Sequence, residues 1–196
     1  NRNPAHRAYF AVLIRGKNIA IDLNGHTLES VEHYEDGNTY CHGTICLNRK
    51  SSLNITDTAG GGIVKDNGVH YAVWSHYSED SYLDIFGGIF MGQSYGGYSY
   101  DMNEIGAGAL IYGGGIELDE SGTTVAGEHG SINIYGGYFL FENADKRGAN
   151  GAFNVGNPAT GRTITIHDGV MLINQRYRET FDEDTVFLQD GCELEK

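Results

Sequence analysis

The chain has little proline, little cysteine and few basic side chains. Its 196 residues include 2 prolines and 3 cysteines, and 13 Lys and Arg stand against 26 Asp and Glu. So little proline excludes a Pro-rich linker, and the lack of a Gly-X-Y period excludes collagen. The formal charge of −13 repels phosphate backbones and anionic lipids, so we expect no nucleic-acid partner. No apolar run is long enough to span a bilayer, so we expect no direct membrane insertion.

The three cysteines, Cys41, Cys46 and Cys192, have no zinc-binding spacing and cannot all be paired. Cys41 and Cys46 are close enough in sequence to pair across a turn. The chain shows no signal peptide and begins at Asn1 rather than Met. We therefore expect one domain, residues 1–196, excised from a larger protein.

Glycine and aromatic residues are abundant. The chain contains 29 glycines and 13 tyrosines, and no stretch has a sustained 3.6-residue period. Glycines between short apolar and β-branched runs indicate many tight turns between short strands. The composition therefore predicts an all-β protein.

One motif recurs along the chain: two apolar residues separated by a polar one, followed by a turn. Its second apolar residue falls at positions 23, 55, 85, 134 and 166. Three of the four intervals are 30 to 32 residues, and the interval of 49 residues contains an insertion near residues 92–130. A second short strand precedes each motif, as at Val12–Ile14, and a third follows the turn, as at Ile89–Met91. One such unit cannot bury its apolar face alone, so stacked units must share a core.

The pattern I-x-I-x-G-G-x-F, as in Ile132–Phe139, resembles the coils of the pectate-lyase-like superfamily of right-handed parallel β-helices. The segment Ile21–Leu28 resembles the β-helix segments of large bacterial surface proteins. The resemblance covers roughly residues 8–190. It implies a right-handed parallel β-helix of about five coils, located outside the cell or at the cell surface. Known functions in this superfamily include lyases, hydrolases, tailspikes, adhesins and carbohydrate-binding domains, so the fold leaves the function open.

Stacking turns the outward positions of the motif into rows of side chains. Aligning the markers predicts one row of Asp22, Asn54, Asp84, Asn133 and Thr165, flanked by Ala20, Ser52, Tyr82, Ser131 and Thr163 and by Asn24, Thr56, Phe86, Tyr135 and His167. Aromatic faces stack on the C–H face of a sugar, and amides and carboxylates bind its hydroxyls. The candidate ligand-binding residues are Asn54, Tyr82, Asp84, Phe86, Asn133 and Tyr135, together with the loop aromatics Trp74 and Tyr77. These residues predict a glycan or polysaccharide partner; the alternative is that they only fill exposed strand positions.

The insertion reads as a hairpin with an acidic turn formed by Glu117, Asp119 and Glu120. These carboxylates could help to hold Ca²⁺, but the spacing of an EF-hand or an RTX repeat is absent. We expect no other cofactor.

The alternative to a binding module is a polysaccharide-degrading enzyme. Asp22 and Asp84, placed two coils apart in one row, would be separated by about 9.6 Å, near the upper limit for an inverting glycosidase. A lyase needs a basic residue and a cation, and the pair Arg49-Lys50 lies on a turn without a carboxylate cluster in the sequence beside it. A third hypothesis is a structural spacer in a surface protein with flanking domains.

Overall fold

The computed structural model describes residues 9–30, 34–35, 38–39, 41–48, 50–66, 71–75, 81–94, 109–113, 130–143, 153–154, 163–167, 170–174 and 192–194. All regular secondary structure within these ranges is β-strand. The all-β prediction is therefore confirmed for the described part of the chain.

Three sheets, here named A, B and C, contain all but two of these strands, and every pairing within them is parallel. Sheet A consists of β1 (Tyr9–Arg15), β6 (Cys41–Asn48), β9 (Tyr71–Ser75), β12 (Ala109–Tyr112) and β15 (Phe153–Asn154). Sheet B consists of β2 (Asn18–Asp22), β7 (Ser52–Thr56), β10 (Tyr82–Ile85), β13 (Ile132–Ile134), β16 (Ile164–Ile166) and β18 (Cys192–Leu194). Sheet C consists of β3 (Thr27–Glu29), β8 (Ile63–Lys65), β11 (Ile89–Ser94), β14 (Gly137–Asn143) and β17 (Val170–Asn174). The short strands β4 (Tyr34–Glu35) and β5 (Asn38–Thr39) form an antiparallel pair.

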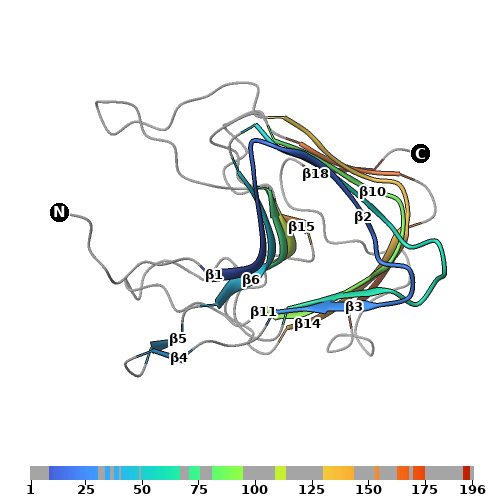
Figure 1. Cartoon of the computed structure of the whole chain (residues 1–196). Coiled ribbons are helices and arrows are strands. Elements are labelled where there is room, and N and C mark those ends of the chain that lie inside the picture. Colours follow the sequence, from blue (N-terminus) through green and yellow to red (C-terminus); the bar gives the residue numbers. More distant parts are fainter. Residues whose placement is uncertain are drawn as a thin grey trace.

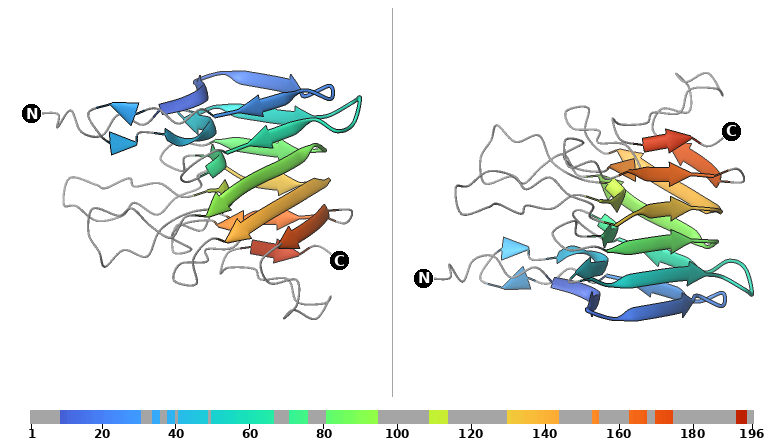
Figure 2. Two further views of the ribbon diagram at one scale, coloured as in Figure 1. Left: turned by 90° about the horizontal axis from the view of Figure 1, so that it is seen from below. Right: turned by 90° about the horizontal axis from the view of Figure 1, so that it is seen from above.

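The chain visits sheets A, B and C in turn and then returns to sheet A beside its previous strand. Figure 1 looks along the stack, so the strands of one sheet overlap, and Figure 2 shows the same strands side by side. The first coil, β1 to β3, lies at one end of the stack, and β18 lies toward the other end. The three-strand repeat predicted from the sequence is therefore confirmed as a β-helix-like stack of coils.

The core is built from the inward residues of all three sheets. In sheet B the row Ile55, Ile85, Ile134 and Ile166 is buried, because strand alternation directs each of these residues to the same face. Phenylalanines fill the space between sheets C and A. The rings of Phe90 and Phe139 stack at 4.8 Å, and Phe153 packs edge-on against Phe139 at 4.9 Å.

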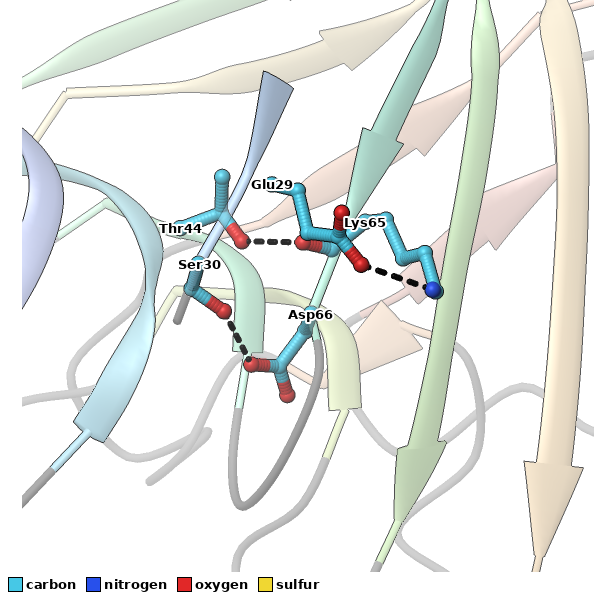
Figure 3. A network of polar contacts seen from close by, with 5 residues as sticks. All are labelled: Glu29, Ser30, Thr44, Lys65 and Asp66. Carbon is cyan, nitrogen blue, oxygen red and sulfur yellow. Dashed lines mark hydrogen bonds and ion pairs between the residues drawn. The ribbon is translucent and has the colours of Figure 1, made fainter. Parts of the chain in front are cut away.

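A polar network joins sheet C to sheet A near the first two coils (Figure 3). Asp66 is only 4% exposed, and its carboxylate accepts a hydrogen bond of 3.1 Å from the hydroxyl of Ser30. The hydroxyl of Thr44, on β6, donates to the carbonyl of Lys65 at 2.6 Å, and the Lys65 ammonium pairs with Glu29 at 2.7 Å. A buried carboxylate requires such partners, so this network stabilises the corner between the sheets.

The predicted insertion at 92–130 needs correction, because β12 lies inside that range. β12 pairs with β9 on one side and β15 on the other, as expected for the strand that precedes a motif. The extra length therefore belongs to two segments, 95–108 and 114–129, on either side of a core strand. Both segments, with the predicted acidic hairpin, lie outside the described residues.

Candidate functional site

The outward face of sheet B carries three adjacent rows of polar and aromatic side chains, named here the sheet B strip. Paired strand residues define most members of each row. Residues just before or after a strand are assigned to a row by the alternation of side chains along that strand. The first row holds Asn18, Ser52, Tyr82, Ser131 and Thr163; the second holds Ala20, Asn54, Asp84, Asn133 and Thr165; the third holds Asp22, Thr56, Phe86, Tyr135 and His167. From the second coil onward these are the rows predicted from the sequence.

The predicted register of the first coil is wrong by two residues. Ile21, not Leu23, lies opposite Ile55, and Asp22 lies opposite Thr56. Leu23 is also buried, but it follows the end of β2, in a turn where Asn24 has a φ of 46°. Because both apolar residues fit an alternating pattern, the sequence alone could not choose between two registers of the same parity.

This correction separates the two carboxylates of the hydrolase hypothesis. Asp22 belongs to the third row and Asp84 to the second, so strand geometry places their backbones about 12 Å apart. An inverting pair needs a separation of about 6.5–9.5 Å between carboxyl groups, and a retaining pair needs less. The row alignment that suggested a catalytic pair is therefore absent.

The Asp22 carboxylate is instead used to hold two turns together. It accepts hydrogen bonds from the Thr58 hydroxyl at 2.6 Å, the Thr58 backbone N–H at 3.0 Å and the Asn24 N–H at 3.1 Å. The Thr58 hydroxyl, more than any other group, holds the pKa of Asp22 below its usual value. A carboxyl group that stays ionised in this way is poorly suited to act as a general acid.

A second carboxylate braces the same turns. Asp57 accepts a hydrogen bond from the Gly25 N–H at 2.9 Å and another from the Gly62 N–H at 2.7 Å. These bonds link the turn of the first coil to the turn of the second. We therefore interpret both Asp22 and Asp57 as parts of the turn structure.

Asp84 occupies a different environment, in the centre of the sheet B strip. It lies between Asn54 and Asn133, and the Asn133 amide donates a hydrogen bond to its carboxylate at 2.8 Å. Asn54 is exposed, and both Asp84 and Asn133 are half-buried. A carboxylate has two oxygens and an amide both donates and accepts, so this group can hydrogen-bond to several hydroxyls.

The aromatic residues of the third row form a continuous stack. The rings of Phe86 and Tyr135 are 4.9 Å apart and nearly parallel, and those of Tyr135 and His167 are 4.2 Å apart. The predicted aromatic group was Tyr82, Phe86 and Tyr135; the stack joins two of these residues and adds His167. Because each ring covers the face of the next, Tyr135 offers mainly its edge. Phe86, 50% exposed, has the small residue Thr56 as its neighbour on the other side.

Tyr82 differs from this stack in its neighbours. It is 48% exposed in the first row and lies opposite Ser52, with Ser131 preceding the strand on its other side. Two small neighbours leave more room over the ring than a stacked aromatic would. β10 and the residue after it therefore present Tyr82, Asp84 and Phe86 at consecutive outward positions.

Trp74 lies on sheet A, and the structure does not bring it to the sheet B strip. Its ring contacts those of Phe10, Tyr71 and Tyr112, with centroids 5.7, 5.4 and 6.0 Å away. Tyr71 and Tyr112 stack at 4.4 Å, and burial raises the pKa of the Tyr71 hydroxyl. These rings pack on one another, and Trp74 remains half-buried. Tyr77 lies outside the described residues.

The outward face of sheet C was not recognised from the sequence. Ile63, Ile89 and Tyr138 form one row there, and Met91 and Leu140 continue the row of Lys65. Tyr138 is 52% exposed. The continuous apolar runs Ile89–Met91 and Tyr138–Leu140 are typical of strands with two apolar faces, and that signal was present in the sequence.

No cluster of three or more metal-ligating side chains occurs among the described residues. The carboxylates suggested for Ca²⁺, Glu117, Asp119 and Glu120, lie outside them. Nor does the described part of the chain contain a helix long and apolar enough to cross a membrane. Cys46 is a free, buried thiol and forms no disulfide with Cys41. Burial raises the pKa of the Cys46 thiol to about 12.

Comparison with known proteins gave no relative: no family model, no curated protein and no solved structure matches the chain significantly. Any functional proposal therefore rests on the residues and geometry of the chain itself.

Proposed function

We propose that the chain is an extracellular or cell-surface carbohydrate-binding or adhesive module that does not cleave its ligand. The observation that carries the proposal is the outward face of β10 and its neighbours. Here the exposed ring of Tyr82 lies between two serines and beside the hydrogen-bonded pair Asp84 and Asn133. An exposed ring supplies a stacking face, and the neighbouring pair supplies donors and acceptors for hydroxyls.

The spacing of these groups suits a ligand that lies across the strands. Outward residues on one strand are about 6.6 Å apart, and adjacent strands are about 4.8 Å apart. A sugar stacked on Tyr82 therefore has the Asp84 row within reach of its hydroxyls. Further sugar units of the same chain would pass over Asn54 on one side or Asn133 on the other.

The charge of the sheet B strip favours a neutral glycan. Its described residues include the carboxylates of Asp22 and Asp84 and no Lys or Arg. A uronate or sulfate group placed over Asp84 would meet a like charge without a compensating cation. We therefore propose neutral polysaccharides or oligosaccharides as the first ligands to test.

We infer that the coil is a right-handed parallel β-helix like those of the pectate-lyase-like superfamily. The course of the chain in Figure 1, clockwise from β1 through β2 to β3 with later coils behind, supports this inference. The membership implies sugar ligands only by analogy, because the fold carries many activities. Flanking domains of a larger surface protein remain part of the same proposal.

The test is retention of the whole chain in native gels that contain neutral or acidic polysaccharides, with product release analysed by chromatography in parallel. We expect retardation by at least one neutral polysaccharide and no oligosaccharide products. Tyr82→Ser should abolish the retardation, whereas Tyr138→Ser, an equally exposed tyrosine on sheet C, should retain it.

Two outcomes would oppose the proposal. Product release that is lost in Asp84→Asn would support the alternative, a hydrolase or lyase of this superfamily. Absence of both retardation and products across the panel would favour a structural spacer.

A further inference from the structure

Among the described residues, the first coil lies at one end of the stack. β1, β2 and β3 each occupy the end of their sheet, so within the described residues each has a strand partner on one side only. Two exposed aliphatic side chains belong to this coil, Leu13 at 48% and Ile19 at 40%. Their neighbours in the second coil, Cys46 and Leu53, are 3% and 0% exposed. Ile19 therefore belongs to an inward row of sheet B but, within the described residues, has a neighbouring strand on one side only.

The backbone of β2 has a defined set of groups directed away from the stack. Hydrogen bonds from Ser52 N–H to the Lys17 carbonyl and from Leu23 N–H to the Thr56 carbonyl show that odd-numbered residues bond to β7. Alternate residues of a strand point to opposite sides, so Asn18, Ala20 and Asp22 direct their N–H and C=O groups to the open edge.

Within the described residues, β2 has few of the features that usually prevent strand pairing. Natural edge strands are protected by proline, by lysine or by charges that point inward. β2 contains neither proline nor lysine, and its two inward residues are Ile19 and Ile21. Such an edge is a template for another strand.

The charge of the first coil favours approach of a second copy by this end. Residues 9–30 contain Arg15 and Lys17 against Asp22 and Glu29, a formal charge of zero, whereas the whole chain carries −13. Residues 9–30 of two copies therefore add no net charge repulsion when the first coils face each other.

We propose that the chain forms a two-fold dimer through its first coil, by antiparallel pairing of β2 with β2 of a second copy. A two-fold axis at Ala20 places Ala20 opposite Ala20, and Ile19 opposite Ile21 of the partner. Asn18 then lies opposite Asp22 of the partner. In this register the N–H and C=O groups of Asn18, Ala20 and Asp22 bond to the partner strand. The side chains of Ile19 and Ile21 become buried at the same time.

A different mode of self-association is head-to-tail stacking of the first coil on the opposite end of the next copy. That contact is heterologous and does not close, so it would give open-ended polymers instead of a dimer. The two modes are therefore distinguished by the size of the assembly.

The first experiment is light scattering after size-exclusion chromatography of the whole chain over a range of concentrations. We expect a mass of twice 21.4 kDa for the wild type. Ala20→Pro removes an N–H that is directed to the open edge and leaves the bonds to β7 in place, so it should weaken the dimer at least tenfold. Ile19→Lys should do the same, and Tyr138→Lys, which adds the same charge on sheet C, should leave the dimer unchanged. Circular dichroism checks that each variant is folded.

The register is tested by oxidative cross-linking in a background with Cys41 and Cys192 replaced by serine. Directly opposed residues in a hydrogen-bonded antiparallel pair have Cα atoms about 5.5 Å apart, within the range of a disulfide. Ala20→Cys should cross-link to itself, and Asn18→Cys, which faces Asp22, should do so at least tenfold more slowly. A monomer at every concentration, open-ended polymers or equal cross-linking at both positions would overturn the proposal.

Discussion

At the scale of single residues, similar side chains on the sheet B strip have different tasks. Tyr82 presents an exposed ring beside small neighbours, whereas Tyr135 is enclosed between Phe86 and His167. Asp84 lies at the surface and accepts a hydrogen bond from Asn133. The Asp22 carboxylate instead accepts a hydrogen bond from Thr58, in a turn of the next coil. The neighbours of each residue in its row, more than its type, decide whether it is available to a ligand.

The ring of Tyr135 should therefore contribute to stability. Tyr135→Ala removes two stacked pairs, each of which contributes about 0.5–1.5 kcal/mol, so we expect a loss of about 1–3 kcal/mol in the free energy of unfolding. Urea denaturation measures this change. Tyr138→Ala, in a position of similar exposure, serves as the control. Equal losses in the two variants would mean that the stack adds nothing beyond burial.

The hydrogen bonds of Asp22 predict a dependence of stability on pH. Its pKa is lowered in the folded state, so ionised Asp22 stabilises the fold above the unfolded-state pKa, and this contribution is lost as the pH falls through the folded-state value. Asp22→Asn should consequently be less stable than the wild type at pH 7, and the difference should shrink near pH 3.

Urea denaturation at both pH values tests this prediction. In a Thr58→Val background, which removes the strongest partner of the carboxylate, the effect of Asp22→Asn at pH 7 should be smaller. A difference between wild type and Asp22→Asn that is independent of pH would contradict the assignment.

At the scale of elements, the turns between sheets B and C determine how closely the coils stack. Gly62 follows the turn that Asp57 braces, and a Cβ atom there would lie 2.5 Å from the Cβ of Leu23 and 2.7 Å from the Asp57 carboxylate. The first contact involves an atom fixed to the backbone, so the neighbouring coil would have to move.

Gly62→Ala should therefore destabilise the protein by about 1–3 kcal/mol through overpacking. Gly60→Ala is the matched control in the same turn, because its Cβ would meet nothing within 4 Å although its φ is +76°. Gly60→Ala should cost about 1 kcal/mol through backbone strain alone. Thermal unfolding of both variants distinguishes the two effects, and a smaller loss for Gly62→Ala would show that the turn yields easily.

Much of this element-level organisation could be predicted from the sequence. Alternation and turn glycines identified most strands of the three sheets and the rows of coils two to five, because each marker there has one apolar pair before its turn. The strand β18 was not predicted. The predicted register of the first coil was wrong because Ile19, Ile21 and Leu23 fit two equivalent registers. Pairing with β7 decides between them. The stack of Tyr135 on His167 and the brace of Asp57 also could not be predicted, since both depend on contacts between coils.

At the scale of the whole molecule, burial changes from one end of the stack toward the centre. Ile21 and Ile55 occupy the same inward row, but Ile21 is half-buried in the first coil and Ile55 is fully buried between two coils. Ile55→Val should cost about 0.5–1.5 kcal/mol, the usual range for a buried isoleucine, and Ile21→Val should cost less.

Urea denaturation of the two valine variants at low protein concentration measures this gradient. Low concentration matters because a dimer through β2 would bury Ile21 and raise its contribution. Equal costs for the two variants in the monomer would contradict the account of an open first coil.

The central claim is that the outward face of sheet B binds a glycan, and its most direct test is a titration followed by amide chemical shifts in NMR. The ligand would be an oligosaccharide prepared from the neutral polysaccharide that retards the protein in gels. The account predicts that the shifts change at Asn54, Tyr82, Asp84 and Asn133, with little change on sheet C. Shifts centred on Trp74 and Tyr112 of sheet A, or no change at all on β10, would contradict it.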